Sequence, residues 1–321
     1  MGLLWPGFLM AVACACRRVS APGGLAIMPA LAASAPTHRR RGIRVEESPA
    51  PEPVLLVEDI GPVRRFTMNR PKALNALSGE LIQALSQALD GAAADPSVRV
   101  VILKGAGRAF CAGHDLNEDA GAGAKDSVGW HEELKHAADE MLRFFDFPKP
   151  VIAQVHSYCL AGGCDLMMIC DLTVCSEDAR FGEPEIRFGS GVVTMVMPWV
   201  LGARKAKELL FTGEDRIDAA EALRIGLVNK VVPTDQLDDA TLALAEEIAK
   251  NDPFAVSMQK KAINKMWEVA GFREAIDANV VIDTMIEVAD LPEREEFRTI
   301  TLEQGLKKAI EWRDARFREN R

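Results

Sequence analysis

The sequence predicts an α/β domain that ends in a helical region. Apolar runs typical of β-strands alternate with helical patterns over the first two thirds of the chain, and from about residue 204 the pattern is almost entirely helical. The 321 residues are 48% apolar and 26% charged, a composition that supplies a sizeable core and excludes fibrous and mainly disordered proteins. The length allows one large domain or two modest ones.

Five apolar runs predict the strands. A β-type run lies on each side of Gly61-Pro62, which predicts a hairpin there. Later runs are continuously apolar, as are strands buried on both faces of a parallel sheet. The segment Gly105–Gly113 is expected to be a loop. The predicted strands are Val54–Ile60, Val63–Met68, Val98–Leu103, Val151–Val155 and Asp171–Ser176.

The helices follow from apolar residues at three- and four-residue spacing. Ser78 is expected to cap a helix whose apolar face holds Leu81, Leu85 and Leu89, and residues 131–145 are amphipathic in the same way. The C-terminal helices are rich in apolar residues, which we expect to pack against a neighbour in the same chain or in another subunit. Further helices are predicted near residues 204–211, 217–225, 235–250, 254–269, 272–289 and 294–316.

Residues 1–45 differ in composition from the rest of the chain. They hold six Arg, no Lys and no acidic residue, and they show no sustained period. A secretory signal is disfavoured because Arg17-Arg18 follows the apolar stretch instead of preceding it. The Arg-rich, acid-poor composition fits an organellar transit peptide, although the Ser content is low; the alternative is an unstructured extension. We expect this segment to be dispensable for stability and turnover.

Charge and cysteine content exclude other classes of protein. The net charge of −9 offers no basic surface for nucleic acid. No stretch of about 18 apolar residues predicts a membrane span. Seven Cys, an odd number, argue against a disulfide framework and favour a reduced intracellular compartment. Cys164 and Cys170 are expected to be small buried packing residues.

Two glycine-bearing turns are the strongest local motifs. Ala109–Leu116 reads AFCAGHDL, and Ser157–Leu166 reads SYCLAGGCDL and opens an apolar helix after a predicted strand. Glycine lets a ligand approach the backbone, and a helix N-terminus presents unpaired N–H groups. Two such donors from separate turns would bind an oxyanion, although Gly-Gly before a helix more often serves only strand–helix packing. Neither turn matches a nucleotide phosphate-binding motif.

Two carboxylates accompany these turns. Asp165 falls in the first turn of the apolar helix, and Glu185 falls in the polar loop Phe181–Arg187. An acid at a helix start usually complements the helix dipole, and an acid in a loop is usually solvated. Acid–base chemistry would require both carboxylates to face one pocket, where burial raises a pKa.

With these motifs in place, the chain resembles the crotonase, or enoyl-CoA hydratase/isomerase, superfamily. The resemblance covers about residues 52–316 in the family's order and spacing. It implies a crotonase-like spiral core of ββα units with a helical C-terminal oligomerisation region. The matching stretches are Met68–Ala76, Ala109–Leu116, Lys149–Ala153, Tyr158–Asp171, Phe181–Glu185, Phe211–Gly213, Ala219–Asn229 and the tail Glu303–Arg313.

The resemblance also implies a site. The backbone N–H groups of His114 and Gly162 would form the thioester oxyanion hole, with the His114 ring passive. Asp165 and Glu185 stand where hydratases carry two catalytic carboxylates, so that Glu185 would be the principal acid/base and Asp165 would assist with water. The resemblance implies no metal or other cofactor, because CoA is part of the acyl-CoA substrate. The positions that match CoA-binding residues are Lys72, Ala73, Leu74, Ala112, Gly113, Asp115 and Leu116.

Hydration of a 2-enoyl-CoA thioester is the activity that the resemblance favours, and two departures weaken it. Asp165 is one methylene shorter than the usual Glu, and Val193 replaces a glycine near the reacting carbons. Val193 also stands where dienoyl-CoA isomerases carry a third acid, which disfavours that reaction as well. An enoyl-CoA isomerase, a thioester or C–C hydrolase, and a non-catalytic acyl-CoA-binding scaffold remain alternatives.

The expected organisation has three parts: an extension at residues 1–50, an acyl-CoA-binding core at 51–250, and a helical region at 251–321 that completes the site and the subunit interface. We expect a homotrimer or a dimer of trimers, with no nucleic-acid or membrane partner. The expected location is the cytoplasm, or the mitochondrial matrix if the extension is a transit peptide. Residues 120–145 and 188–200 are expected to line the acyl pocket.

Overall fold

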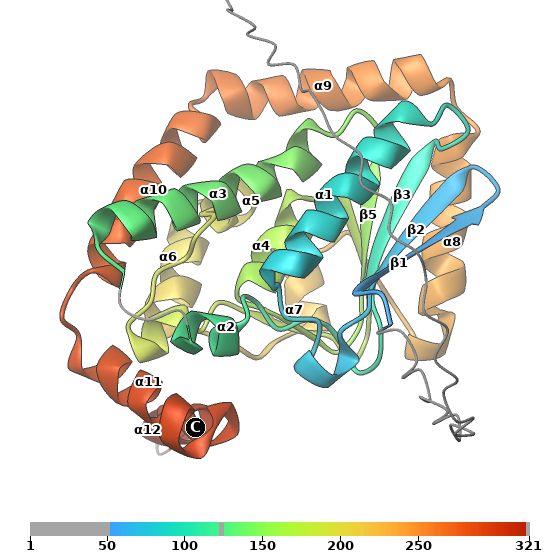
Figure 1. Ribbon diagram of the computed structural model, residues 1–321. Coiled ribbons are helices and arrows are strands. Elements are labelled where there is room, and N and C mark those ends of the chain that lie inside the picture. Colours follow the sequence, from blue (N-terminus) through green and yellow to red (C-terminus); the bar gives the residue numbers. More distant parts are fainter. Residues whose placement is uncertain (1–51, 122–124, 319–321) are drawn as a thin grey trace, which may run out of the picture. The chain divides into compact units, whose positions relative to one another are not determined.

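A six-stranded sheet forms the centre of the computed structural model (Figure 1). The structure describes residues 52–121 and 125–318, so the expectations for the N-terminal extension lie outside the described residues. One compact unit runs from Pro51 to Arg321 and includes the C-terminal helices. In spatial order the strands are β1 (Leu55–Ile60), β2 (Val63–Met68), β3 (Val100–Gly105), β5 (Val151–Val155), β7 (Leu172–Ser176) and β10 (Lys230–Val232).

The pairing of these strands confirms the predicted hairpin and parallel core. β1 and β2 are antiparallel, with Ile60 opposite Val63 across the turn. The remaining neighbours are parallel, and β5 is buried along its whole length, as its continuous apolar run predicted. All five predicted strands are present within two residues of their expected bounds. The sequence missed β10, because three residues are too few to show a periodic pattern.

A second, smaller sheet follows directly from three of these strands. β4, β6 and β8 come two or three residues after β3, β5 and β7, and they pair in parallel in the order β4-β6-β8. The expected loop at Gly105–Gly113 therefore contains a short strand, which forms because a parallel partner lies beside it. The strands of this sheet are β4 (Ala109–Cys111), β6 (Tyr158–Leu160), β8 (Arg180–Gly182) and β9 (Ile217–Asp218).

Helices cover the large sheet on both faces. On one face lie α1 (Gly79–Ala94), α3 (Ser127–Asp146) and α4 (Gly162–Ile169), and on the other lies α8 (Leu237–Ala249), as Figure 1 shows. Alternate strand residues divide between the faces, because Leu103 packs in the first core and Ile102 packs in the second. All eight residues of α4 are buried, so α4 is the central helix of the first layer.

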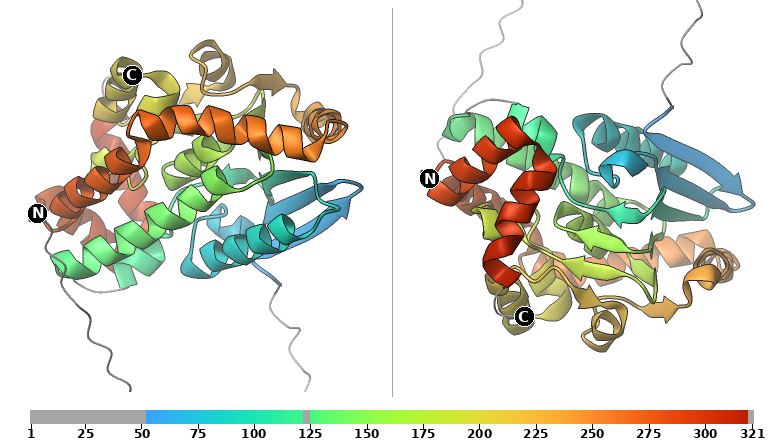
Figure 2. Two further views of the ribbon diagram at one scale, coloured as in Figure 1. Left: turned by 90° about the horizontal axis from the view of Figure 1, so that it is seen from above. Right: turned by 90° about the horizontal axis from the view of Figure 1, so that it is seen from below.

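The C-terminal helices wrap around the first layer. α9 and α10 pass over the side that carries α3, as Figures 1 and 2 show. α11 and α12 pack against each other, and α11 lies beside α2 (Leu116–Gly121). The helix predicted at 294–316 is two helices, because Gly305 breaks it with a φ of +89° that favours glycine. These helices are α9 (Pro253–Val269), α10 (Phe272–Glu287), α11 (Pro292–Gln304) and α12 (Leu306–Arg318).

Short elements connect these layers. Ser78 caps α1 as predicted, because its side-chain oxygen accepts a hydrogen bond from the backbone N–H of Leu81. Within the described ranges, no helix is both long and apolar enough to span a membrane. The short helices are η1 (Pro71–Ala73), α2 (Leu116–Gly121), η2 (Glu185–Phe188), α5 (Met197–Leu201), α6 (Ala203–Thr212), α7 (Ala219–Arg224) and η3 (Thr234–Gln236).

Candidate active site

The candidate site forms where three strands of the small sheet end. In register, Cys111 lies opposite Cys159, and Leu160 lies opposite Gly182. Because β4, β6 and β8 are parallel neighbours, the chain leaves all three at the same edge. The three departing segments carry His114, Gly162 and Glu185, respectively. This topology brings together the residues that the sequence analysis selected.

The two glycine turns lie directly against one another. Gly113 has a φ of +98°, and a Cβ there would lie 2.5 Å from the Cβ of Ala161 and 3.3 Å from the backbone N of Gly162. A Cβ on Gly162 would lie 2.8 Å from the His114 ring. Contacts this short leave room only for hydrogen, so both turns require glycine at these positions.

The geometry leaves two backbone donors available at this contact. Among the residues that the structure describes, the N–H groups of His114 and Gly162 donate to no other protein group. Gly162 is the first residue of α4, where an N–H has no partner within the helix. Ala161, just before it, has φ 55° and ψ −138°, a strained conformation held by a 2.8 Å hydrogen bond from its N–H to the Gly182 carbonyl.

The His114 ring lies beside these donors. Its Nε2 is buried and has no hydrogen-bond partner among the described residues. Burial lowers the pKa of this imidazole, so the ring is neutral at physiological pH. The ring therefore contributes contact surface and one polar nitrogen to the wall of the site.

Asp165 and Glu185 are both buried at the same place. Asp165 is 1% exposed, and its Oδ2 accepts a 3.4 Å hydrogen bond from the backbone N–H of Thr194. Glu185 opens η2 and is 9% exposed, so it does not lie in a solvated loop. One carboxylate oxygen of each, Oδ1 and Oε2, has no donor within the described ranges. Both carboxyl groups are therefore buried, and each has one oxygen free to meet a bound molecule.

Their surroundings set the protonation of the pair. Burial, and then the charge of Glu185, raises the pKa of Asp165 well above its ordinary value. Burial raises the pKa of Glu185 to about 7, although a hydrogen bond with Glu183 and the guanidinium of Arg313 oppose the rise. Two buried carboxylates this close do not both ionise near neutral pH, so the pair holds one proton there.

The structure adds two buried carboxyl groups that the sequence analysis did not select. Glu183 is 2% exposed and meets Glu185. Asp283, on α10, is 2% exposed and contributes to the electrostatic surroundings of both Asp165 and Glu185. The described residues nevertheless include no group of three or more His, Cys, Asp or Glu arranged to hold a metal ion.

A polar stripe on α10 holds the segment that covers the site. Asn279 donates to the carbonyls of Val192 and Val193 at 2.8 and 3.1 Å, and Glu287 accepts from the Ser190 hydroxyl at 2.5 Å. Asp283 lies between them and so close to Gly191 that a Cβ there would be 1.8 Å from Oδ1. Polar residues four apart on a mostly apolar helix were the sequence signal for this stripe.

The residues that match CoA-binding positions lie side by side. Ala112 donates to the Leu74 carbonyl at 3.1 Å, and Leu77 donates to the Gly113 carbonyl at 2.8 Å. Lys72 is exposed on η1. The structure therefore brings Lys72, Ala73 and Leu74 together with Ala112, Gly113, Asp115 and Leu116.

Two residues that the sequence analysis left out organise this part of the site. Arg70 forms a 2.7 Å ion pair with Asp115, which also accepts from the backbone N–H of Asn117. The fully buried Asn75 donates to the carbonyls of Ala106 and Ala109 at 2.9 and 2.8 Å. The Asp115 side chain is thus engaged in supporting the turn.

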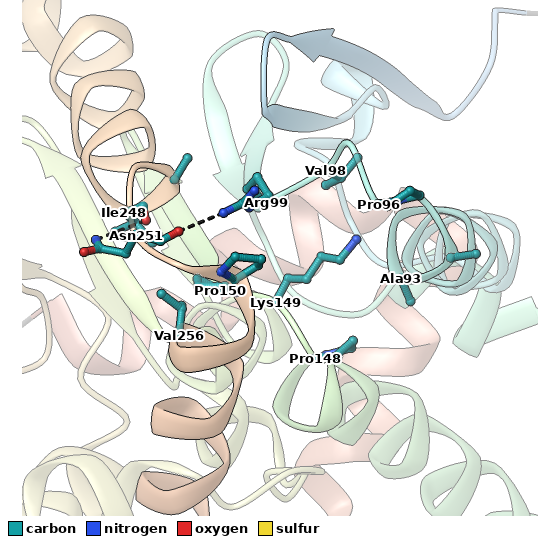
Figure 3. A pocket seen from close by; sticks show the side chains of 13 residues that line it. Ala93, Pro96, Val98, Arg99, Pro148, Lys149, Pro150, Ile248, Asn251 and Val256 are labelled. Carbon is teal, nitrogen blue, oxygen red and sulfur yellow. Dashed lines mark hydrogen bonds between the residues drawn. The ribbon is translucent and has the colours of Figure 1, made fainter.

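A separate cavity lies at the opposite ends of the strands (Figure 3). It has a volume of about 300 Å³ and is lined by residues that precede β3 and β5, by the end of α8 and by the start of α9. Lys149 donates to the carbonyls of Ala92 and Asp95 at 2.6 Å, and Arg99 donates to the Asn251 carbonyl at 2.8 Å. Because the glycine turns follow the carboxyl ends of the strands, this cavity is no part of the carboxylate site.

Comparisons with known proteins place the chain in a family. A family model described as enoyl-CoA hydratase/isomerase matches residues 60–320. The short-chain-enoyl-CoA hydratase of Clostridium acetobutylicum is 38% identical over 221 residues, which cover 66% of this chain and 81% of the relative. The mitochondrial enoyl-CoA hydratase of Pongo abelii is 38% identical over 205 residues, 63% of this chain and 69% of the relative.

A solved structure shows the same fold. The crystal structure of an enoyl-CoA hydratase/isomerase from Xanthobacter autotrophicus Py2 has a TM-score of 0.80 and 42% identity, covering 82% of this chain and 98% of that chain. The chain is therefore a member of the enoyl-CoA hydratase/isomerase family of enzymes.

Proposed function

We propose that the chain adds water across the double bond of a 2-enoyl-CoA thioester. The observation that carries this proposal is the placement of two buried carboxyl groups, Asp165 and Glu185, beside two available backbone N–H groups. The names of the relatives, which are hydratases of enoyl-CoA thioesters, support the same reaction. The departure at Val193 does not remove either carboxyl group from the site.

The N–H groups of His114 and Gly162 bind the thioester carbonyl oxygen in this proposal. Negative charge collects on that oxygen as the enolate forms, and two fixed donors stabilise it more than they stabilise the neutral carbonyl. Removing one such donor typically costs about 10²–10³ in turnover. Steric requirements at Gly113 and Gly162 support this role, because they keep both turns in place.

The two carboxyl groups divide the transfer of protons. The oxygen of a water molecule bonds to the β-carbon while Asp165 accepts a proton from that water, and the carboxylic acid of Glu185 gives its proton to the α-carbon. In the reverse direction Glu185 takes the α-proton and Asp165 protonates the leaving hydroxide. Both directions use a pair that holds one proton, the form that burial and mutual repulsion favour near neutral pH.

CoA is bound as part of the substrate, and the reaction needs no metal or redox cofactor. Lys72 is exposed beside the paired segments Leu74–Leu77 and Ala112–Asp115, where it would meet the phosphates of CoA. The acyl chain would lie against residues 188–200 and against residues 120–145, of which 122–124 lie outside the described residues. We propose no nucleic-acid or membrane partner.

We propose the same organisation as the sequence analysis: an extension at 1–50, an acyl-CoA-binding core at 51–250 and a helical region at 251–321 that completes the site. Asn279, Asp283 and Arg313 support the last point, because all three come from the helical region and reach the carboxylate site or its cover. We further propose that the protein acts in the cytoplasm, or in the mitochondrial matrix, which fluorescent fusions with and without residues 1–45 would distinguish.

A homotrimer or a dimer of trimers is the proposed assembly. Large apolar side chains on α9 and α10 are exposed, and closed symmetric assembly would remove them from water. A stable monomer in sedimentation at micromolar concentration would contradict this. The residues concerned are Phe254, Ile263, Met266, Val269, Ile282 and Met285.

Mass analysis of products from a panel of enoyl-CoA thioesters tests the reaction. Hydration adds the mass of one water, isomerisation leaves the mass unchanged, and thioester hydrolysis releases free CoA. Thermal stabilisation by acyl-CoA without any product would favour the non-catalytic scaffold instead. We expect the gain of water and its reversal when a 3-hydroxyacyl-CoA is supplied.

A further inference from the structure

Glu183 is the buried carboxyl group that the proposed reaction does not use. It lies between β8 and η2, and its backbone N–H donates to the Glu214 carbonyl at 2.9 Å. Gly182 before it has no room for a side chain, since a Cβ there would lie 2.1 Å from that same carbonyl oxygen. With Pro184 after it, the backbone is held on both sides, so the spacing between Glu183 and Glu185 is fixed.

The Glu183 side chain is surrounded mainly by acidic groups. Its two carboxylate oxygens are buried, and no N–H group or hydroxyl in residues 52–121 or 125–318 donates to either. The carboxyl of Glu185, two residues along the chain, acts on Glu183 as a side-chain hydrogen-bond partner, and its buried Oε2 likewise has no donor among the described residues. Two carboxyl groups can form a hydrogen bond only when they share a proton, so one of the two is an acid.

The neighbours decide which of the two holds the proton. Glu183 faces Asp165, Glu185 and the thiol of Cys164, with burial as the dominant influence, and together these raise its pKa well above the ordinary value. Glu185 faces Asp283 but also the guanidinium of Arg313. Because the guanidinium of Arg313 acts on Glu185, whereas burial and acidic groups dominate the surroundings of Glu183, the negative charge belongs on Glu185.

We propose that Glu183 is a positioning residue for Glu185: it stays a neutral carboxylic acid, and its O–H donates a hydrogen bond to the Glu185 carboxylate. This donor lowers the cost of ionising a buried carboxyl, and without it Glu185 would keep its proton to higher pH. Glu183 thus stabilises the singly protonated pair in which Asp165 holds the proton and Glu185 is the base, the form that takes the α-proton in the reverse direction. The catalytic use of Glu185 rests on the proposed function; the protonation of Glu183 does not.

Two substitutions test whether Glu183 acts as a neutral hydrogen-bond donor or as a negative charge. Glu183→Gln keeps a neutral N–H donor of the same length, and Glu183→Met keeps the volume but removes the donor. We expect the acid limb of the pH profile of kcat/KM to stay at its wild-type position in Glu183→Gln. In Glu183→Met we expect the limb to move up by about one to two pH units, the equivalent of one hydrogen bond to a charged group.

Specific outcomes would overturn the proposal. A limb that moves to lower pH in Glu183→Gln would mean that Glu183 carries a negative charge, and a limb that does not move in Glu183→Met would mean that no hydrogen bond reaches Glu185. Glu177→Gln, at an exposed position just after β7, is the matched control and should leave the profile unchanged.

An infrared measurement on the intact enzyme tests the protonation without turnover. At pH 8 the wild-type protein should show a carbonyl stretching band from protonated carboxyl groups, and part of it should be lost in Glu183→Gln but not in Glu177→Gln. An identical band in wild type and Glu183→Gln would overturn the proposal even if no enoyl-CoA were turned over. Loss of part of the band without any hydratase activity would instead refute only the proposed function.

Discussion

The backbone N–H of Thr194 donates a 3.4 Å hydrogen bond to the Oδ2 of Asp165. Thr194 ends the segment that Asn279 and Glu287 hold against α10. Thr194, which orients the Asp165 carboxyl, lies 29 positions after it in the chain. Asn279, which holds the Thr194 segment, comes from the C-terminal helices, so these helices orient Asp165 indirectly. The same segment contains Val193, which precedes Thr194 directly and whose carbonyl accepts a hydrogen bond from Asn279.

Replacing the principal acid/base removes most turnover. Glu185→Gln keeps the shape of the side chain but cannot exchange a proton, and we expect a loss of about 10²–10⁴-fold in kcat. Binding of a saturated acyl-CoA, measured by calorimetry, should stay close to wild type. Glu80→Gln, an exposed acid in the first turn of α1, serves as the control. Weakened binding equal to the lost turnover would mean that Glu185 contributes affinity instead of chemistry.

Activity depends on pH through the same group. The pKa of Glu185 lies at about 7, and below it both carboxyl groups of the pair are protonated. Because the reactive form holds a single proton, kcat/KM is expected to rise with pH through about 7. The profile should be measured with wild type and with Glu185→Gln. An activity that is already constant from pH 5 upward would contradict the assignment.

Replacing Asp165 and replacing Glu185 are expected to slow different steps of the reaction. Asp165→Asn should reduce hydration more than exchange of the α-proton with solvent deuterium, because Asp165 acts on water and Glu185 acts on the α-carbon. Glu185→Gln should reduce both. Mass spectrometry of deuterated acyl-CoA gives the second rate. If Asp165→Asn hydrates at the wild-type rate, Asp165 only complements the dipole at the start of α4. The isomerase or hydrolase activity would then be favoured over the hydratase activity.

A single methyl group at the glycine turns should disable the oxyanion hole. Gly162→Ala would place a Cβ 2.8 Å from the His114 ring and so separate the two donors. We expect kcat to fall by about 10²–10³, the usual effect of losing one donor. Gly79→Ala is the control, because a Cβ at the start of α1 meets no atom within 4 Å. A normal kcat in Gly162→Ala would exclude the Gly162 N–H from the hole.

The pH dependence of the thermal stability should reveal the ionisation of the buried Asp283. Burial, and then the charge of Glu287, raises the pKa of Asp283 from 3.8 to about 7. The folded state therefore holds a proton that the unfolded state has released above about pH 4, so this stabilisation is complete at low pH and is lost as pH rises through 7. Asp283→Asn is neutral at every pH and should raise Tm at pH 8 by roughly 5 °C.

The control for this change lies on the same helix. Asp277, at an exposed position of α10, pairs with Lys135 at 3.4 Å, and Asp277→Asn should leave Tm within about 1 °C of wild type at either pH. At pH 5, Asp283→Asn should differ less from wild type than at pH 8. An equal effect at both pH values would mean that packing, and not ionisation, sets the contribution of Asp283.

The sequence by itself determined the elements and the residue types of the site. Continuous apolar runs predicted β3 and β5, Ser78 predicted the start of α1, and the two glycine turns predicted available backbone donors, because each is a local pattern of burial, capping or backbone freedom. Asp165 and Glu185 were also selected from the sequence, although only as a pair that needed a common pocket.

Only the tertiary structure decided how these residues are brought together. The strands β4, β6 and β8 have three residues each, too few to show a period, yet their parallel pairing brings His114, Gly162 and Glu185 to one edge. Nothing in the sequence distinguishes Glu183 and Asp283 from ordinary solvent-exposed acidic residues. Asp283 is buried against Gly191, and Glu183 lies near Asp165 and pairs its backbone with Glu214. Their burial, and the proton that it keeps on them, therefore arise from contacts between separate segments, which no local pattern records.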